Sequence, residues 1–159
     1  MKKTLFQILF AAIVFAPFSL FAQTNFPLGE LEKMCLKNAN DFDTYVLGKD
    51  YSIQSKLSDG VTKMYWSDKP GAAGKPYTVA RFQNPKAIPI VKCTTTDKKY
   101  YIELKTALAA NGYKFDKEEN KTVNGIQSVW YIYTKGVKQV SLTSYNEGEV
   151  TWYGVHIHL

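Results

Sequence analysis

The chain has 159 residues, 45% of them hydrophobic, and a formal net charge of +6. Its lysines are scattered, with no run longer than two, so we expect no nucleic-acid partner. The sequence holds no phosphate-binding glycine loop, no G-x-S-x-G element and no H-E-x-x-H element, which leaves no recognisable catalytic motif.

The first 22 residues have the pattern of a secretory signal peptide. Lys2-Lys3 form a basic start, an apolar run follows over residues 5–14, and the segment closes at Ala22. The run is short for the roughly 20 residues of a membrane span, so we expect cleavage and no span in the mature chain. No cysteine begins the mature chain, so a lipobox is not indicated. We expect a bacterial protein that is periplasmic or secreted.

Two cysteines, Cys35 and Cys93, follow the signal. In an oxidising compartment an even pair is most simply one disulfide, which we expect to join them. On the chain-entropy account, a loop of this length stabilises by about 4 kcal/mol. The alternative is a redox or nucleophilic thiol, but the sequence has no CxxC spacing to support it.

The first half of the mature chain predicts one helix followed by strands. Pro27 suits a first helical turn, and an apolar stripe at near 3.6-residue spacing then continues to Val46. The stripe contains Leu31, Cys35, Ala39, Phe42 and Val46. After Gly48 we expect an irregular strand over 51–57 and regular strands over 61–67, 77–83 and 88–94, with a turn at Asn84-Pro85.

The second half repeats this order. Thr94 to Asp97 has capping-box spacing, and the following helix is expected to stop at Gly112. Residues 113–123 are read as a polar connection. From Gly125 to Leu159 we expect three antiparallel strands, with tight turns at Lys135-Gly136 and Glu147-Gly148.

The predicted fold class is therefore α+β, with two tandem helix-plus-three-stranded antiparallel units whose helices pack on one sheet face. The units are 23–94 and 95–159, sharing one compact domain. The segment from Gly60 to Trp66 matches the segment from Gly125 to Tyr131, which favours an internal duplication. The alternative is that helix and three strands are simply a common local order.

Alternation along the last three strands separates two faces. The apolar face, expected under the helices, carries Val129, Tyr131, Val140, Leu142, Tyr153, Val155 and Ile157. The other face mixes aromatic, hydroxyl and imidazole groups, which is too polar for a core. Aromatic side chains are enriched at interface hot spots, although such pairs also serve only to stabilise a sheet. The candidate binding residues are Trp130, Ile132, Tyr145, Trp152, His156 and His158.

The histidines are two residues apart on one strand, a spacing that could present both to a metal. A zinc site normally needs three or four protein ligands, and no Asp, Glu or Cys lies beside them in the expected sheet. We therefore expect no metal, no cofactor and no catalytic residue.

A signal peptide followed by tandem helix-plus-sheet repeats with aromatic strand faces resembles the beta-lactamase-inhibitor-protein-like group of exported bacterial proteins. The resemblance covers Leu28 to Leu159 and rests on element order. It implies protein binding through the sheet face, without a cofactor. The repeats of that group have a helix-loop-helix and four strands, whereas the units expected here have one helix and three strands.

Together these patterns predict an exported, non-enzymatic binding protein, possibly an inhibitor of another protein, that uses the aromatic face of its C-terminal sheet. The alternatives are a small exported hydrolase or metal-dependent enzyme using His156 and His158, and a small-ligand carrier with a pocket between sheet and helices. The oligomeric state is left open.

Overall fold

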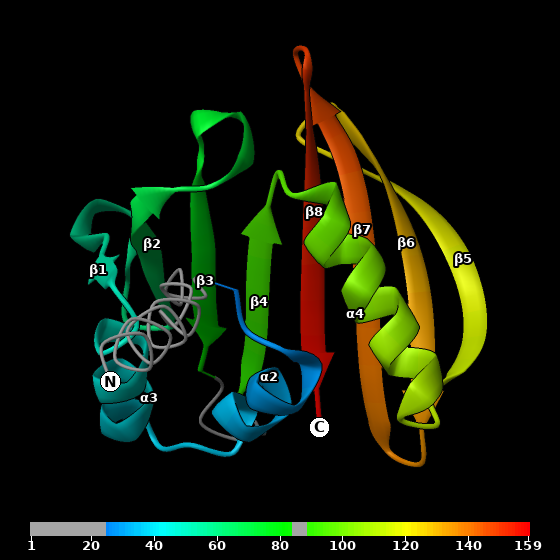
Figure 1. The fold of residues 1–159 in the computed structure, drawn as a ribbon, viewed down its shortest axis with the longest axis horizontal. Helices are drawn as coiled ribbons and strands as arrows, with labels where there is room; N and C mark the ends of the chain where they lie inside the picture. The colour runs from blue at the N-terminus through cyan, green and yellow to red at the C-terminus, as the bar shows by residue number, and fades with distance from the viewer. Residues whose placement is uncertain (1–24, 84–88) are drawn as a thin grey trace, which may run out of the picture.

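The computed structural model describes residues 25–83 and 89–159. The expected signal peptide (residues 1–22) and the expected turn at Asn84-Pro85 lie outside them. In the described residues, eight strands form one antiparallel sheet in the order β1-β2-β3-β4-β8-β7-β6-β5 (Figure 1). The strands are β1 (Tyr51–Ile53), β2 (Thr62–Pro70), β3 (Pro76–Phe82), β4 (Ile90–Thr95), β5 (Lys114–Val123), β6 (Ile126–Lys135), β7 (Lys138–Glu147) and β8 (Val150–His158).

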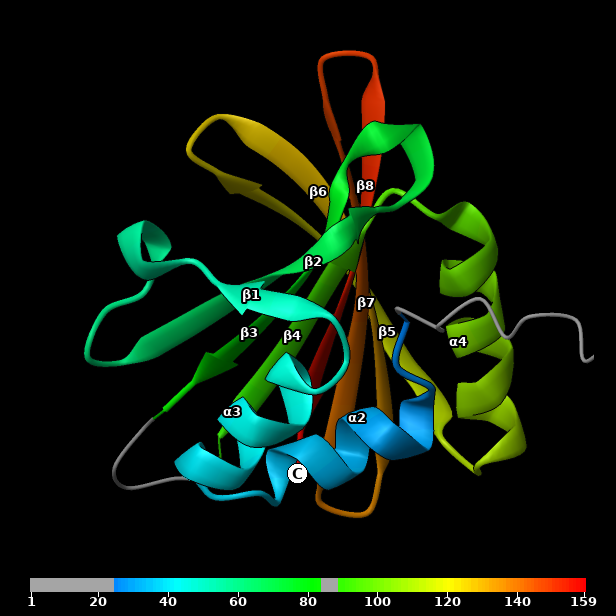
Figure 2. The same ribbon diagram turned by 60° about the vertical axis from the view of Figure 1, so that its left-hand side comes forward.

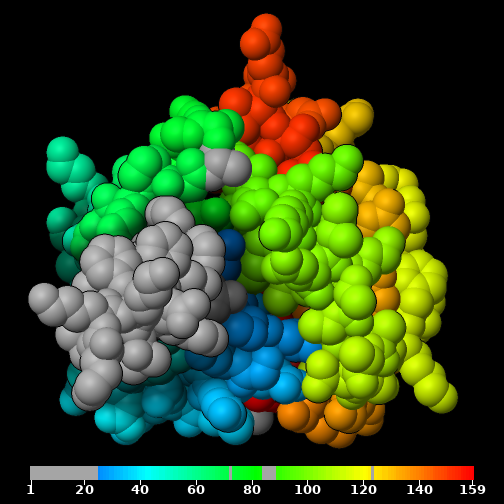
Figure 3. Space-filling view, in the orientation of Figure 1, coloured from blue at the N-terminus to red at the C-terminus, as the bar shows by residue number. Residues whose placement is uncertain are grey.

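All three described α-helices lie on the same face of this sheet (Figures 1 and 2). They are α2 (Leu28–Cys35), α3 (Ala39–Leu47) and α4 (Lys98–Ala110). α2 contacts β4 and β8, α3 contacts β1, and α4 contacts β8. In the space-filling view, α2 and α4 cover the middle and right of this face (Figure 3). None of these described helices is long and apolar enough to span a membrane.

The predicted fold class is wrong in its units. Each half contributes four strands to one continuous sheet, not three strands to a unit of its own. The second half gains β5, which was expected to be a polar connection. β5 is an edge strand whose side chains are mostly exposed, so its sequence has no apolar alternation to reveal it.

The expected single helix of the first half is also wrong, because the chain breaks it into α2 and α3. Leu36 is 69% exposed in the break. Asn38 then caps α3, since its side-chain oxygen accepts a hydrogen bond from the Asp41 backbone N–H at 2.9 Å. With this break, both short helices bury apolar side chains in the core, among them Leu31 and Met34 of α2 and Phe42 and Val46 of α3.

The core fills the layer between the sheet and the helices. On β7 and β8 it contains Val140, Leu142, Val155 and Ile157, each at most 2% exposed. The sequence assigned these side chains to the helix-covered face, and this assignment is confirmed. Tyr153 of the same face packs against Tyr101 of α4, with ring centroids 4.8 Å apart.

Cys35 on α2 and Cys93 on β4 both lie in this core. They are free thiols in the structure, so the expected disulfide is not formed there. The Cys35 thiol instead donates a weak hydrogen bond to the Ile157 carbonyl, at 3.7 Å. Burial raises the pKa of the Cys35 thiol to about 12 and also raises the pKa of Cys93. A thiol held protonated is a poor nucleophile, which argues against the redox alternative. Disulfide pairing after export stays a prediction.

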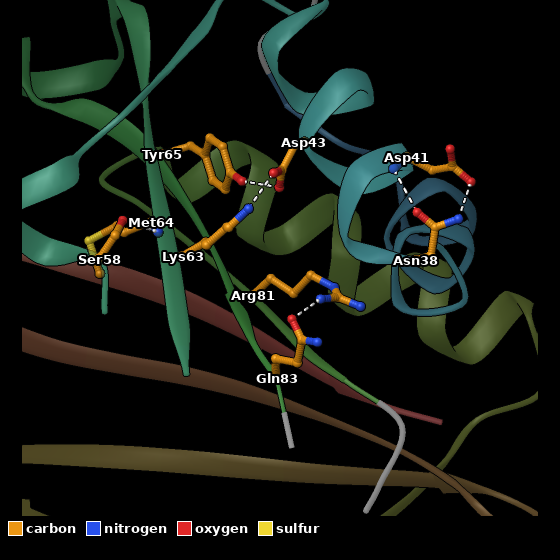
Figure 4. Close-up of polar contacts among 9 residues, drawn as sticks. All are labelled: Asn38, Asp41, Asp43, Ser58, Lys63, Met64, Tyr65, Arg81 and Gln83. Atoms are coloured by element: carbon orange, nitrogen blue, oxygen red, sulfur yellow. Dashed lines mark hydrogen bonds and ion pairs between the residues drawn. The ribbon is translucent and has the colours of Figure 1, made fainter. Parts of the chain in front are cut away.

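A carboxylate ties α3 to the sheet (Figure 4). Asp43 of α3 accepts hydrogen bonds from the Tyr65 hydroxyl and the Lys63 ammonium of β2. The Tyr65 side chain is fully buried, so Asp43 satisfies a hydroxyl that water cannot reach easily.

Asp43→Ala is expected to lower the free energy of unfolding by about 1–3 kcal/mol, because it leaves the Tyr65 hydroxyl without its acceptor. Urea denaturation measures the loss. Asp41→Ala is the matched control on the same helix: Asp41 is exposed and pairs with the Asn38 side chain, so less than about 1 kcal/mol should be lost. Equal losses in the two variants would contradict an anchoring role for Asp43.

Candidate functional site

The face of the sheet opposite the helices is called the open face here. One row of register partners crosses it from β2 to β5. In spatial order the row contains Trp66, Thr78, Thr94, Gly154, Thr143, Trp130 and Glu119. The row thus has a tryptophan near each side and small residues at the junction of the two halves.

The small residues at the centre are buried although no described helix covers them. Thr94 is 7% exposed and Thr143 3%, and Ser141, in the neighbouring row of the same face, is 1% exposed. The reason is curvature, since the β5–β6 hairpin bends to the side away from α4 (Figure 2). Larger side chains on neighbouring strands then stand around the short ones, so the open face is recessed at its centre.

A hollow of about 420 Å³ occupies this recess. Trp130, Tyr145 and His156 line it, together with Thr143 of β7 and Lys92 of β4. Asn124 and Ile126, from the β5–β6 turn, line it as well. Side chains from both halves of the chain therefore meet in one site.

Trp130 is held from several directions. Its ring lies against the His156 ring, with centroids 4.7 Å apart. Its indole N–H donates to the Ser128 hydroxyl at 2.9 Å. The Lys121 ammonium lies 4.3 Å from the ring centroid, and is itself paired with Glu119 at 2.9 Å. Such contacts from three sides fix the position of the Trp130 ring.

Gly154 makes room for this arrangement. A Cβ at this position would overlap the Thr143 hydroxyl and would lie 3.7 Å from Nε2 of His156. The missing side chain therefore leaves room beside the β8 backbone for the Thr143 side chain and for the ring of His156, two residues further along the same strand.

Gly154→Ala is expected to cost about 1–3 kcal/mol of unfolding free energy through this overlap. Adding Thr143→Ala removes the overlapping hydroxyl, so the double variant should recover part of the loss. Chemical denaturation of the two single variants and the double variant gives the coupling, expected at about 0.5–3 kcal/mol. Strictly additive effects would show that the two residues do not meet as described.

His156 is neutral over a wide pH range. Burial, and secondarily the charge of Lys92, lower its pKa to about 3 from an ordinary 6.5. Burial also lowers the pKa of His158. In the described residues, no group of three or more His, Cys, Asp or Glu side chains is placed to hold a metal ion.

This lowered pKa predicts a pH dependence of stability. Below pH 6.5 the unfolded chain protonates His156 while the folded chain does not, until pH approaches about 3. Within that window each pH unit should cost up to about 1.4 kcal/mol of stability. His156→Gln should therefore lose less stability than the parent between pH 7 and pH 4 in urea titrations. His158→Gln retains His156, whose pKa is lowered more, and should therefore keep more of the fall than His156→Gln does. Identical curves for the parent and His156→Gln would contradict the lowered pKa.

The structure brings together only some of the predicted site residues. Trp130, Tyr145 and His156 line the hollow. Trp152 stacks beside Tyr145, with centroids 6.4 Å apart and planes at 11°. His158 pairs with Gln139 in the register, and Ile132 is only 5% exposed, which leaves it little surface for a partner.

Sequence reasoning missed Lys92, because it treated the C-terminal strands alone. A signal was present: Lys92 lies between Val91 and Cys93, so alternation places a charged side chain opposite two buried ones. The β5–β6 turn was missed for another reason. Asn124-Gly125 is a strong hairpin signal, but the polar strand before it was taken for a connection.

No protein-family model matches the chain, and a comparison with curated proteins finds no similar sequence. The class of protein therefore follows from the fold and the site. It is an α+β protein with one antiparallel sheet, helices on one face and a recessed aromatic site on the other.

Proposed function

We propose that this chain is an exported, non-enzymatic binding protein that holds a segment of another protein on its open face. The observation that carries the proposal is the hollow of about 420 Å³ lined by Trp130, Tyr145 and His156. Exposed aromatic side chains held rigidly in a recess are typical anchors of protein contacts. Because the centre is recessed, the partner must insert a narrow segment and cannot rest there with a flat surface.

The two alternatives have less support. A pKa of about 3 makes His156 a weak general base near neutral pH, which disfavours a hydrolase built on it. A carrier pocket between sheet and helices has less support, because in the described residues the space lined by Tyr100, Leu104 and Val155 is too narrow to admit a water molecule. A second space, beside Pro27 and Leu28, measures about 120 Å³, below the usual size of ligand sites.

The resemblance to the beta-lactamase-inhibitor-protein-like group is part of the proposal. Four strands in each half, with the helix pair α2–α3 in the first, are closer to the repeats of that group than the units expected from sequence. Inhibition of another exported protein is therefore a reasonable form of the proposed binding. Export itself rests on the pattern of residues 1–22.

Trp130→Ala is expected to weaken partner binding by about thirtyfold or more, as for a hot-spot aromatic worth about 2 kcal/mol. The immobilised mature protein is incubated with the envelope fraction of its source, and bound proteins are quantified by mass spectrometry. A protein enriched by the parent is then purified and titrated against each variant.

Trp66→Ala is the matched control, because Trp66 lies on the same row and face, is 37% exposed, and is not among the lining residues. It should bind like the parent. Tyr145→Ala is a second test variant that leaves the Trp130–His156 contact in place. Equal capture by the parent, Trp130→Ala and Tyr145→Ala, all melting as folded proteins, would refute the open face as the binding site.

A further inference from the structure

Lys92 places a positive charge where the described chain supplies no counter-ion. Its neighbours Val91 and Cys93 are buried in the core, so its own side chain is directed to the open face, where it is partly buried. No hydrogen bond or ion pair of its ammonium group is found within residues 25–83 and 89–159. Burial lowers the pKa of Lys92, as expected for an ammonium group that is partly removed from water.

The neighbours of Lys92 leave space beside it. Its register partners are Ala80 on β3 and His156 on β8. Ala80 has a short side chain and is 2% exposed, and His156 is a neutral ring. Lys92 itself lines the hollow with Trp130, Tyr145 and Thr143.

Within the described residues, neither Glu119 nor Glu147 forms an ion pair with Lys92. Glu119 accepts from Lys117 at 2.7 Å and Lys121 at 2.9 Å, and these contacts hold its pKa at about 2. Glu147 also lines the hollow, but it is exposed and forms the last register pair of β7, next to the turn. Lys92 thus remains available to an anion that enters from solvent.

We propose that the hollow binds a carboxylate joined to a flat apolar group, with Lys92 as the counter-ion of the carboxylate. This inference rests on the hollow being the binding site of the proposed function. The volume of about 420 Å³ lies in the usual range for small organic ligands. Trp130 and Tyr145 supply aromatic surface for the apolar group, and the Thr143 hydroxyl and the neutral His156 ring are further hydrogen-bonding groups of the lining.

A single lysine among aromatic rings suits a carboxylate better than a phosphate, which typically recruits several charged donors. The required chemistry occurs in two sources: a free aromatic acid, and the C-terminal residue of a protein chain. Both sources present a carboxylate to Lys92. They differ only in the part of the molecule that extends out of the hollow.

Isothermal titration calorimetry at pH 7 tests the inference with defined probes. Phenylacetate is compared with phenylacetamide, and the peptide acetyl-Gly-Gly-Phe is compared with its C-terminal amide. Each carboxylate should bind at least tenfold more tightly than its amide, since a charged carboxylate accepts a stronger hydrogen bond from the ammonium group than a neutral amide does. Binding of the peptide acid alone identifies a chain end as the ligand, whereas binding of phenylacetate identifies a free acid.

Lys92→Met removes the charge at nearly constant length, and should weaken binding of the preferred acid at least tenfold. Lys92→Arg retains the charge and should largely restore it. Lys98→Met, at an exposed lysine of α4, makes the same change in net charge and should bind like the parent. Without ligand, Lys92→Met should melt no lower than the parent, because an unpaired charge has been removed from a partly buried position.

Three results would overturn the inference: no binding of either acid at 10 mM, equal binding of acid and amide, or unchanged acid binding by Lys92→Met. A clear drop in melting temperature of ligand-free Lys92→Met would show that Lys92 has a structural role instead. In each case partner capture through Trp130 can still succeed, so failure here is separable from failure of the proposed function.

Discussion

The pairing of β4 with β8 is the constraint on which the rest of the structure depends. It joins the last strand of each half, so two four-stranded sheets become one, and it sets Val91 opposite Ile157 and Cys93 opposite Val155. A slip of one residue would turn these apolar side chains to the open face, and burial under α2 and α4 therefore fixes the register. The same register carries Lys92 to the side of His156, so the packing of one face determines the chemistry of the other.

Polar side chains on the open face are buried, which would not occur on a flat sheet face without helices over it. Ser141 and Thr143 are nearly inaccessible although no described helix covers them, because the sheet bends and their register partners His156 and Trp130 hold two rings against each other beside them. Rings held this way lose little conformational freedom when a ligand binds, which favours recognition. The site also carries a cost, since burial of Lys92 and His156 disfavours the charged form of each. A ligand that supplies an anion would relieve part of this cost.

The sequence predicted the features set by neighbouring residues better than those set by distant parts of the chain. The two C-terminal turns lie one residue later than expected, because Gly136 and Gly148 open their loops with φ of +59° and +61°. Each register is therefore shifted by an even number of residues, so every side chain stays on its predicted face. The two shifts cancel between β6 and β8, and Trp130 still lies on the row of Gly154. By contrast, β5 was missed because an edge strand needs no buried side and so has no apolar pattern.

By itself, the sequence determined the alternation of the C-terminal strands, the end of α4 just before Gly112, and the aromatic and imidazole groups of the open face. These are local properties, set by backbone geometry over a few residues. Only the tertiary structure decided that β4 lies beside β8, that Lys92 enters the site, and that Ile132 is withdrawn from it. These residues are far apart in the chain. They become neighbours because the whole chain buries as much apolar area as it can under the helices, and no short stretch of sequence reveals that outcome.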